Sequence, residues 1–91
     1  MKKRIKVIIF RSNRSIEAQA IFEDKVKFGR KYVIKKAEES PVLQCKSFGE
    51  NFGAELIKNN IKNIRFDRND FKYHGRVKAF AKGMRRAKVV F

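Results

Sequence analysis

Alternation between apolar and polar residues in the first third of the chain predicts three successive β-strands. Residues 4–10 alternate at first and then become wholly apolar, which is typical of a strand buried on one face at its start and on both faces later. The polar residues 12–15 predict a turn, and residues 16–22 alternate again, so the first two strands are expected to form a hairpin. Residues 26–34 predict a third strand, which Gly29 weakens.

A different spacing, with apolar residues three and four positions apart, predicts a long helix in the middle of the chain. The helix is expected to begin at Ser40-Pro41, because serine caps free backbone N–H groups and proline fits the first helical position. The asparagine pair at 59–60 can end it in a left-handed conformation. Gly49 and Gly53 lie beside its apolar face, which predicts close packing of the helix backbone against a sheet.

The last third of the chain predicts two more strands and a second helix. Residues 61–66 read as a strand, residues 67–75 as a polar and aromatic loop, and residues 77–84 as an amphipathic helix. A short final strand is predicted over residues 88–91. The order βββαβαβ predicts an α/β fold, a two-layer sandwich of a mixed sheet with helices, and we expect residues 1–91 to form a single domain.

The charge of the chain indicates the kind of partner that it binds. The chain has 24 Lys and Arg against 9 Asp and Glu, a formal net charge of +15. No acid occurs in residues 1–16, 25–36 or 71–91, whereas residues 37–61 contain four. Self-repulsion of this size opposes folding unless a polyanion neutralises it, and nucleic acid is the commonest such partner. The alternative is a solvated cationic surface. We expect the near-neutral segment to point away from the anion.

Composition excludes several other classes of protein. The chain is 43% hydrophobic with nine Phe, too much buriable surface for a disordered basic tail. Its single cysteine, Cys45, cannot pair within the chain and is expected in the core. No apolar run approaches the roughly 18 residues of a spanning helix, and charge returns at Arg11 before a signal sequence develops. We therefore expect no membrane association.

Catalytic and metal-binding patterns are absent from the sequence. His74 is the only histidine, and no nucleophile or carboxylate forms an evident constellation with it. His74 and Cys45 lack metal-ligand spacing. We expect His74 to stack or to form hydrogen bonds, and we expect no cofactor, no metal and no small-molecule substrate.

Two separated motifs carry a family resemblance. Residues 65–86 read RFDRNDFKYHGRVKAFAKGMRR. Here the chain resembles the bacterial-type ribosomal protein L eighteen family, whose signature is a strand ending in Phe-Asp-Arg, a short loop, and Tyr-His-Gly-Arg-Val opening a helix. Residues 66–68 and 73–77 supply these motifs in order. Residues 7–10 followed by Arg-Ser-Asn at 11–13 also match the family's first strand and turn.

The resemblance implies a function in the large ribosomal subunit. A member of this family is a structural constituent that binds 5S ribosomal RNA and helps attach it to the large 23S-type RNA in the central protuberance, beside neighbouring 5S-binding ribosomal proteins. It is not an enzyme. The chain is rich in Lys, Ile, Phe and Asn, whose codons are AT-rich, so we expect a bacterial cytoplasm or an organelle, mitochondrion or plastid, with an AT-rich genome. Only four residues precede the first strand, where family members usually carry a longer basic arm.

The predicted RNA-binding residues alternate cations with planar rings in the loop of the second motif. Cations neutralise phosphates, and rings stack on exposed bases, although the same pattern fits a charged loop whose rings pack into the core. Asp67 is expected to pair with Arg68, Arg76 or a loop N–H. The complete predicted set is Lys2, Lys3 and Arg4; Arg11, Ser12, Asn13 and Arg14; Arg68, Asn69, Phe71, Lys72, Tyr73, His74, Gly75 and Arg76; and Lys78 and Lys82.

Two other functions are weighed against RNA binding. A small metal-dependent nuclease needs several carboxylates that converge on its metal ions, and only Glu17 and Asp67 lie on or near predicted strands. A sequence-specific DNA-binding protein would need a helix-turn-helix or zinc pattern, which the chain lacks.

Overall fold

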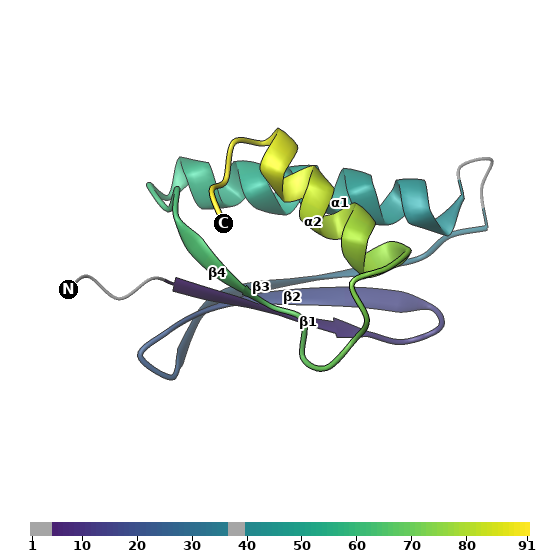
Figure 1. The fold of residues 1–91 in the computed structure, drawn as a ribbon, viewed down its shortest axis with the longest axis horizontal. Helices are drawn as coiled ribbons and strands as arrows, with labels where there is room; N and C mark the ends of the chain where they lie inside the picture. Colours follow the sequence, from purple (N-terminus) through teal and green to yellow (C-terminus); the bar gives the residue numbers. More distant parts are fainter. Residues whose placement is uncertain (1–4, 37–39) are drawn as a thin grey trace.

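A computed structural model describes residues 5–36 and 40–91 as a four-stranded sheet that carries two helices on one face (Figure 1). The strands lie in the order β3-β2-β1-β4, with β1 antiparallel to β2, β2 antiparallel to β3, and β1 parallel to β4. The predicted α/β class, with two layers and a mixed sheet, is confirmed. The elements are β1 (Ile5–Arg11), β2 (Ser15–Phe22), β3 (Lys25–Val33), α1 (Pro41–Lys58), β4 (Ile64–Asp67) and α2 (Arg76–Arg86).

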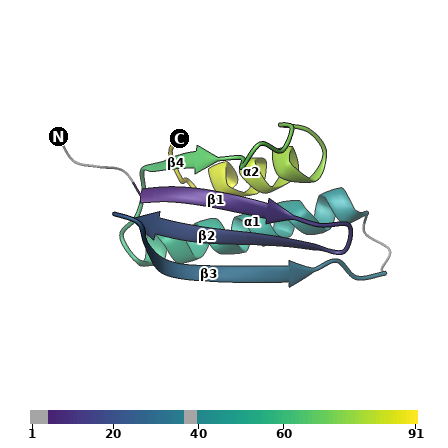
Figure 2. The ribbon, with the colours of Figure 1, turned by 90° about the horizontal axis from the view of Figure 1, so that it is seen from below.

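Strand β1 is buried on one face only. Val7 and Ile9 are fully buried, whereas Ile8 is half-buried and Phe10 is 37% exposed. Both helices cover the same face of the sheet, as the view from below shows (Figure 2), so alternate side chains of β1 lie on the open face. The prediction that both faces of this strand become buried is therefore wrong. The apolar run 7–10 is uninterrupted because Ile8 and Phe10, on the face that no helix covers, are apolar as well.

Aromatic rings from both helices form the centre of the core. Phe48 and Phe52 of α1 meet Phe80 of α2, with ring centroids 5.5 Å and 5.9 Å from that of Phe80. Phe66 of β4 lies 6.1 Å from the same ring. The helical spacing of the apolar residues thus places Phe80 at the point where the two helices and the sheet meet.

Three glycines let the two helices approach closely. A Cβ atom on Gly49 would overlap the carbonyl oxygen of Phe80, and one on Gly83 would overlap the carbonyl oxygen of Lys46. A Cβ on Gly53 would lie 2.8 Å from that of Ala87. The predicted close backbone packing is present, but it is against α2 and not against the sheet, because α1 presents its glycines toward the second helix.

The ends of α1 are as predicted. Ser40 is the N-cap, and its hydroxyl oxygen accepts a hydrogen bond of 3.3 Å from the N–H of Leu43. Beyond the C-cap, Asn60 has the left-handed φ of 64°. In the ranges that the structure describes, neither helix is long and apolar enough to cross a membrane.

The predicted final strand is reduced to a single parallel bridge between Asn63 and Val90. Its two hydrogen bonds join the N–H of Ile64 to the oxygen of Val90 at 3.0 Å and the N–H of Val90 to the oxygen of Lys62 at 2.7 Å. The chain leaves the helical conformation only at Lys88, whose φ is 79°, so few residues remain to pair with the edge of β4. The observed order is βββαβα with this bridge after the last helix.

Candidate nucleic-acid interface

The two motifs that resemble the ribosomal family lie at the same end of the sheet. Residues 68–75, called here the signature loop, connect β4 to α2, and residues 12–14 form the β1–β2 turn. Because β1 and β4 run parallel, both segments leave the sheet at the carboxyl ends of their strands (Figure 2). Residues more than fifty positions apart in the chain therefore meet on one surface.

Asp67 shapes the start of the signature loop. Its Oδ1 accepts a hydrogen bond of 2.8 Å from the N–H of Asn69, and its other oxygen lies 3.8 Å from Nζ of Lys6. Asn69 and Asp70 both have left-handed φ angles, 51° and 65°, which asparagine and aspartate tolerate better than most residues. Of the partners expected for Asp67, the loop N–H is the one observed.

Gly75 ends the signature loop and caps α2. Its φ of 57° and ψ of −120° lie in a region that residues with a side chain rarely adopt. A Cβ atom there would meet nothing within 4 Å, so the backbone conformation and not crowding requires glycine. Among the residues that the structure describes, no side chain caps the first turn of α2, which begins at Arg76.

Arg76 joins the signature loop to the β1–β2 turn. Its Nη1 donates to the carbonyl oxygen of Asn13 at 2.9 Å and approaches that of Ser12 at 3.5 Å. The turn itself is closed by a hydrogen bond of 2.9 Å from the N–H of Ser12 to the oxygen of Ser15. The structure thus brings together the predicted residues of both motifs, and Arg76 makes the contact between them.

The three predicted rings have different surroundings. Phe71 is half-buried and packs against the hydrophobic core, which agrees with the alternative that rings of this loop pack into the core. Tyr73 is 37% exposed, and its hydroxyl lies 3.5 Å from Nη1 of Arg85. His74 is exposed, and its backbone N–H donates to the carbonyl oxygen of Lys72 at 2.8 Å. The two rings open to a ligand are therefore Tyr73 and His74.

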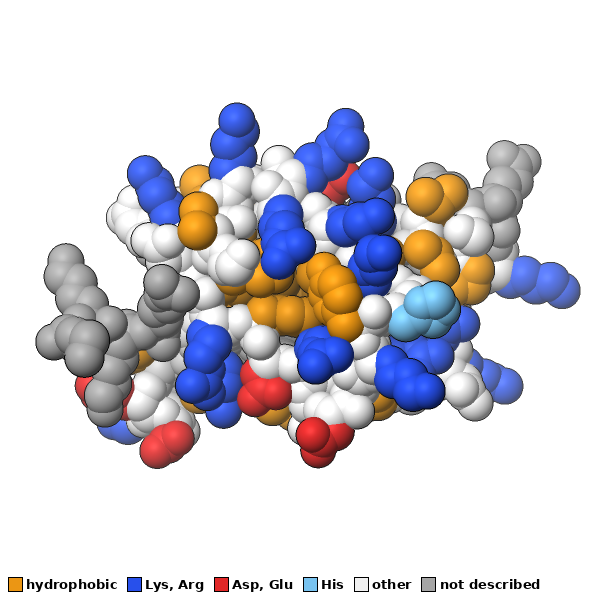
Figure 3. All heavy atoms as spheres, viewed as in Figure 1, with side chains coloured by type: hydrophobic (Ala, Val, Ile, Leu, Met, Phe, Trp, Pro, Cys, Tyr) orange, Lys and Arg blue, Asp and Glu red, His pale blue; other side chains and the backbone are white. Residues whose placement is uncertain are grey.

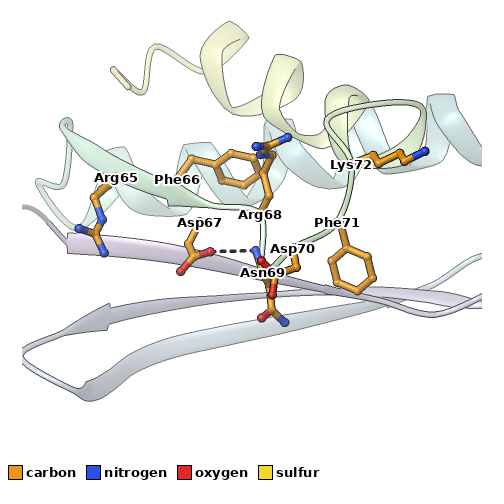
Figure 4. Close-up of a pocket in the computed structure, with 8 residues that line it drawn as sticks. All are labelled: Arg65, Phe66, Asp67, Arg68, Asn69, Asp70, Phe71 and Lys72. Atoms are coloured by element: carbon orange, nitrogen blue, oxygen red, sulfur yellow. Dashed lines mark hydrogen bonds between the residues drawn. The ribbon is translucent and has the colours of Figure 1, made fainter.

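Two hollows adjoin residues 70–72. The first, of about 550 Å³, is lined by residues 65–72 (Figure 4). The second, of about 510 Å³, lies between the signature loop and the amino-terminal end of α1. Its lining residues are Arg11, Val42, Asp70, Phe71, Lys72, His74, Gly75, Arg76 and Val77.

Sequence reasoning missed two residues of this surface. Val42, on the first turn of α1, lines the second hollow, and it is 42% exposed. No sequence signal links it to a loop some thirty positions away. Arg85, which contacts Tyr73, carried a weak signal as part of the cationic face of α2.

The exposed face of α2 is cationic. Lys78, Lys82 and Arg85 are exposed and form no ion pair with an acid of residues 5–36 or 40–91. Figure 3 shows Lys and Arg side chains spread around a central apolar area on this side of the molecule. Two other cations are offset by acids of α1: Arg86 lies 3.7 Å from Glu50, and Arg30 lies 3.1 Å from Glu55.

The remaining predicted residues are placed as follows. Arg11, Arg14 and Arg68 are exposed, while Lys2, Lys3 and Arg4 lie outside the described residues. Cys45 is fully buried in the core, as predicted, and burial raises the pKa of its thiol, partly opposed by the charges of Arg76 and Arg11. Within the described part of the chain, no three residues among His, Cys, Asp and Glu gather in a group that could hold a metal ion.

Comparison with known proteins adds independent information. The sequence model of the family described as ribosomal L18 of archaea, bacteria, mitochondria and chloroplasts matches residues 1–91. The chain is 37% identical over 95 residues to large ribosomal subunit protein uL18 of Treponema pallidum (strain Nichols), covering 97% of this chain and 77% of the relative. It is 33% identical over 99 residues to the protein of that name from Chlorobium luteolum, covering 99% and 80%. For Helicobacter pylori (strain J99) the identity is 39% over 94 residues, covering 98% and 76%. These names describe ribosomal proteins, and none describes a nuclease.

Proposed function

The chain belongs to the ribosomal L18 family of the large ribosomal subunit, and on this premise we propose that it binds 5S ribosomal RNA through the signature loop and the β1–β2 turn. One observation carries the assignment of the surface: Arg76 joins the two family motifs through hydrogen bonds to Ser12 and Asn13. A surface assembled from both motifs presents several separate contact points to a folded RNA.

The proposed binding combines charge neutralisation with stacking. The exposed cations of this surface are Arg68 and Lys72 in the loop, Arg14 in the turn and Arg11 directly before it. Each contact between one of these cations and a phosphate would release condensed counterions. The exposed rings of the loop can stack on unpaired bases, which suits an irregular RNA better than a regular duplex. The side-chain amides of Asn13 and Asn69 supply polar groups for ribose and base edges. The hydroxyl of Ser12, which shares a hydrogen bond of 2.8 Å with that of Ser15, is a further such group. No bond is broken in this function, so the proposed role is structural and requires no catalysis.

We extend the proposal to the position of the protein in the ribosome. Bound 5S RNA would be attached to the large 23S-type RNA in the central protuberance, next to other 5S-binding ribosomal proteins. The cationic face of α2, with Lys78 and Lys82, supports a second area of RNA contact beside the loop. The composition favours a bacterium or an organelle with an AT-rich genome, and the location of the coding DNA decides between them.

A titration of the purified protein against three nucleic acids tests the proposal. Gel shifts with 5S RNA, transfer RNA and duplex DNA should show tight and salt-sensitive binding that favours 5S RNA. Arg68→Gln should weaken this binding, because it removes an exposed cation of the loop. Arg30→Gln is the matched control, since Arg30 is already paired with Glu55 and should matter less. Equal affinity for all three nucleic acids would overturn the assignment to 5S RNA.

A further inference from the structure

We infer that Arg76 is a positioning residue of the RNA-binding surface: it holds the β1–β2 turn against the signature loop and acts on RNA through that turn. The inference rests on the proposed function and assigns a different role to one predicted contact residue. The sequence places Arg76 among the phosphate-binding cations, but its surroundings separate it from them.

The contacts of Arg76 are directed toward the protein. Its Nη1 donates to the carbonyl oxygen of Asn13 at 2.9 Å, across 63 positions of sequence, and approaches that of Ser12 at 3.5 Å. Arg76 is half-buried, whereas Arg68 and Lys72 of the signature loop are exposed. Both contacts come from the single nitrogen Nη1, whose hydrogens the planar guanidinium holds in fixed directions, whereas the hydrogens of a lysine ammonium rotate.

Helix energetics do not account for an arginine at this position. Arg76 is the first residue of α2, and no acid lies in the first turn. The amino-terminal end of a helix carries partial positive charge, which disfavours a cation there. Two main-chain carbonyl oxygens from the β1–β2 turn offset this cost, because hydrogen bonds from a charged donor are stronger than neutral ones.

The turn depends on Arg76 for its relation to the loop. One backbone hydrogen bond within the turn joins the N–H of Ser12 to the oxygen of Ser15 at 2.9 Å. Another connects the turn to the residue after β3, from the N–H of Ile34 to the oxygen of Arg14 at 2.7 Å. Among the described residues, the hydrogen bonds that connect it to α2 are those of Arg76. Losing them would free the turn cations from the loop cations, and an RNA bound by both would lose the benefit of a preorganised surface.

The substitution Arg76→Lys tests the inference. Lysine keeps the charge and still binds phosphate, but it lacks the planar guanidinium that directs Nη1 at the two carbonyl oxygens. In the free protein, nuclear magnetic resonance should show shifted backbone amide signals for residues 12–15. Affinity for 5S RNA should fall about tenfold, while the slope of log affinity against log salt stays unchanged. Arg68→Lys, the matched control, should change affinity by less than about threefold, because a phosphate contact survives the exchange.

A coupling measurement separates positioning from a general loss of stability. When Arg14→Gln has already removed a turn cation, Arg76→Lys should cost less affinity than it does alone. Arg76→Gln is a second variant in case Arg76→Lys folds poorly, and it should move the same amide signals. The inference is wrong if Arg76→Lys leaves both the amide signals of residues 12–15 and the affinity unchanged, while Arg76→Gln reduces the slope of log affinity against log salt by about one counterion. That combination would show that Arg76 is a phosphate contact. Because the amide signals are read without RNA, a lack of preference for 5S RNA would overturn the proposed function alone.

Discussion

Oδ1 of Asp67 accepts a hydrogen bond of 2.8 Å from the backbone N–H of Asn69, so the last residue of β4 shapes the loop that follows it. Asp67→Ala should lower the free energy of unfolding by about 1 kcal/mol, because it leaves this N–H without its acceptor. Urea denaturation followed by circular dichroism measures the change. Asp67→Asn keeps an Oδ1 acceptor and should lie close to the wild type. Equal destabilisation by both variants would show that the charge, and its contact with Lys6, matters more than the hydrogen bond.

The crossing of the two helices should not accept a side chain at Gly83. Gly83→Ala places a Cβ atom against the carbonyl oxygen of Lys46, so the helices must separate, and we expect a loss of about 2 kcal/mol or more in the free energy of unfolding. Thermal and urea unfolding provide the measurement. Gly29→Ala is the control, since its nearest neighbour would be the flexible Cγ of Gln19 at 3.2 Å. A Gly83→Ala protein as stable as Gly29→Ala would contradict the close approach of the helices.

The cationic face of α2 should contribute to RNA affinity through salt-dependent contacts. Replacing both Lys78 and Lys82 with Gln should weaken 5S RNA binding and reduce the slope of log affinity against log salt by about 1.4 to 1.8. Filter binding over a range of KCl concentrations measures both quantities. Lys25 and Lys27 lie at the start of β3, and the β2–β3 turn is at the opposite end of the sheet from the signature loop (Figure 2). Changing these two to Gln alters the net charge equally, so equal effects would indicate that only total charge matters.

Cys45 should make stability depend on pH in the alkaline range. Burial raises the pKa of its thiol above the ordinary value of 9.0, so the folded state holds the proton more tightly than the unfolded state. The resulting stability is fully present below pH 9.0 and is lost as the pH rises from there through the pKa of the folded protein. Urea denaturation under reducing conditions between pH 7 and pH 10 measures it.

Cys45→Ala is the comparison that isolates the thiol. The variant should be less stable at every pH because of the cavity, but its free energy of unfolding should fall less steeply above pH 9.0. Every other ionisable group is common to both proteins and cancels in the difference. Parallel pH profiles for the two proteins would show that the thiol pKa is the same in the folded and unfolded states.

Local patterns predicted the individual elements well, because they depend on neighbours in the chain. Ser40 at the N-cap and Asn60 in a left-handed conformation follow from the needs of helix ends. The amphipathic spacing around Phe80 predicted which face of α2 is buried. The pattern was misleading at Phe10, since an apolar residue looks the same in a sequence whether or not a second layer covers it.

The sequence by itself determined the class of fold, the family and the segments with which RNA contact is proposed, because hydrophobic period, capping residues, charge and motif order are all properties of the chain. Only the tertiary structure decided that Gly49 and Gly83 serve the contact between helices, that Val42 borders the signature loop, and that Arg76 contacts Asn13. These relationships join residues that are far apart in the chain. They arise because β1 and β4 run parallel and both helices cover one face of the sheet, and the spacing of residues along the chain does not encode which surfaces then meet.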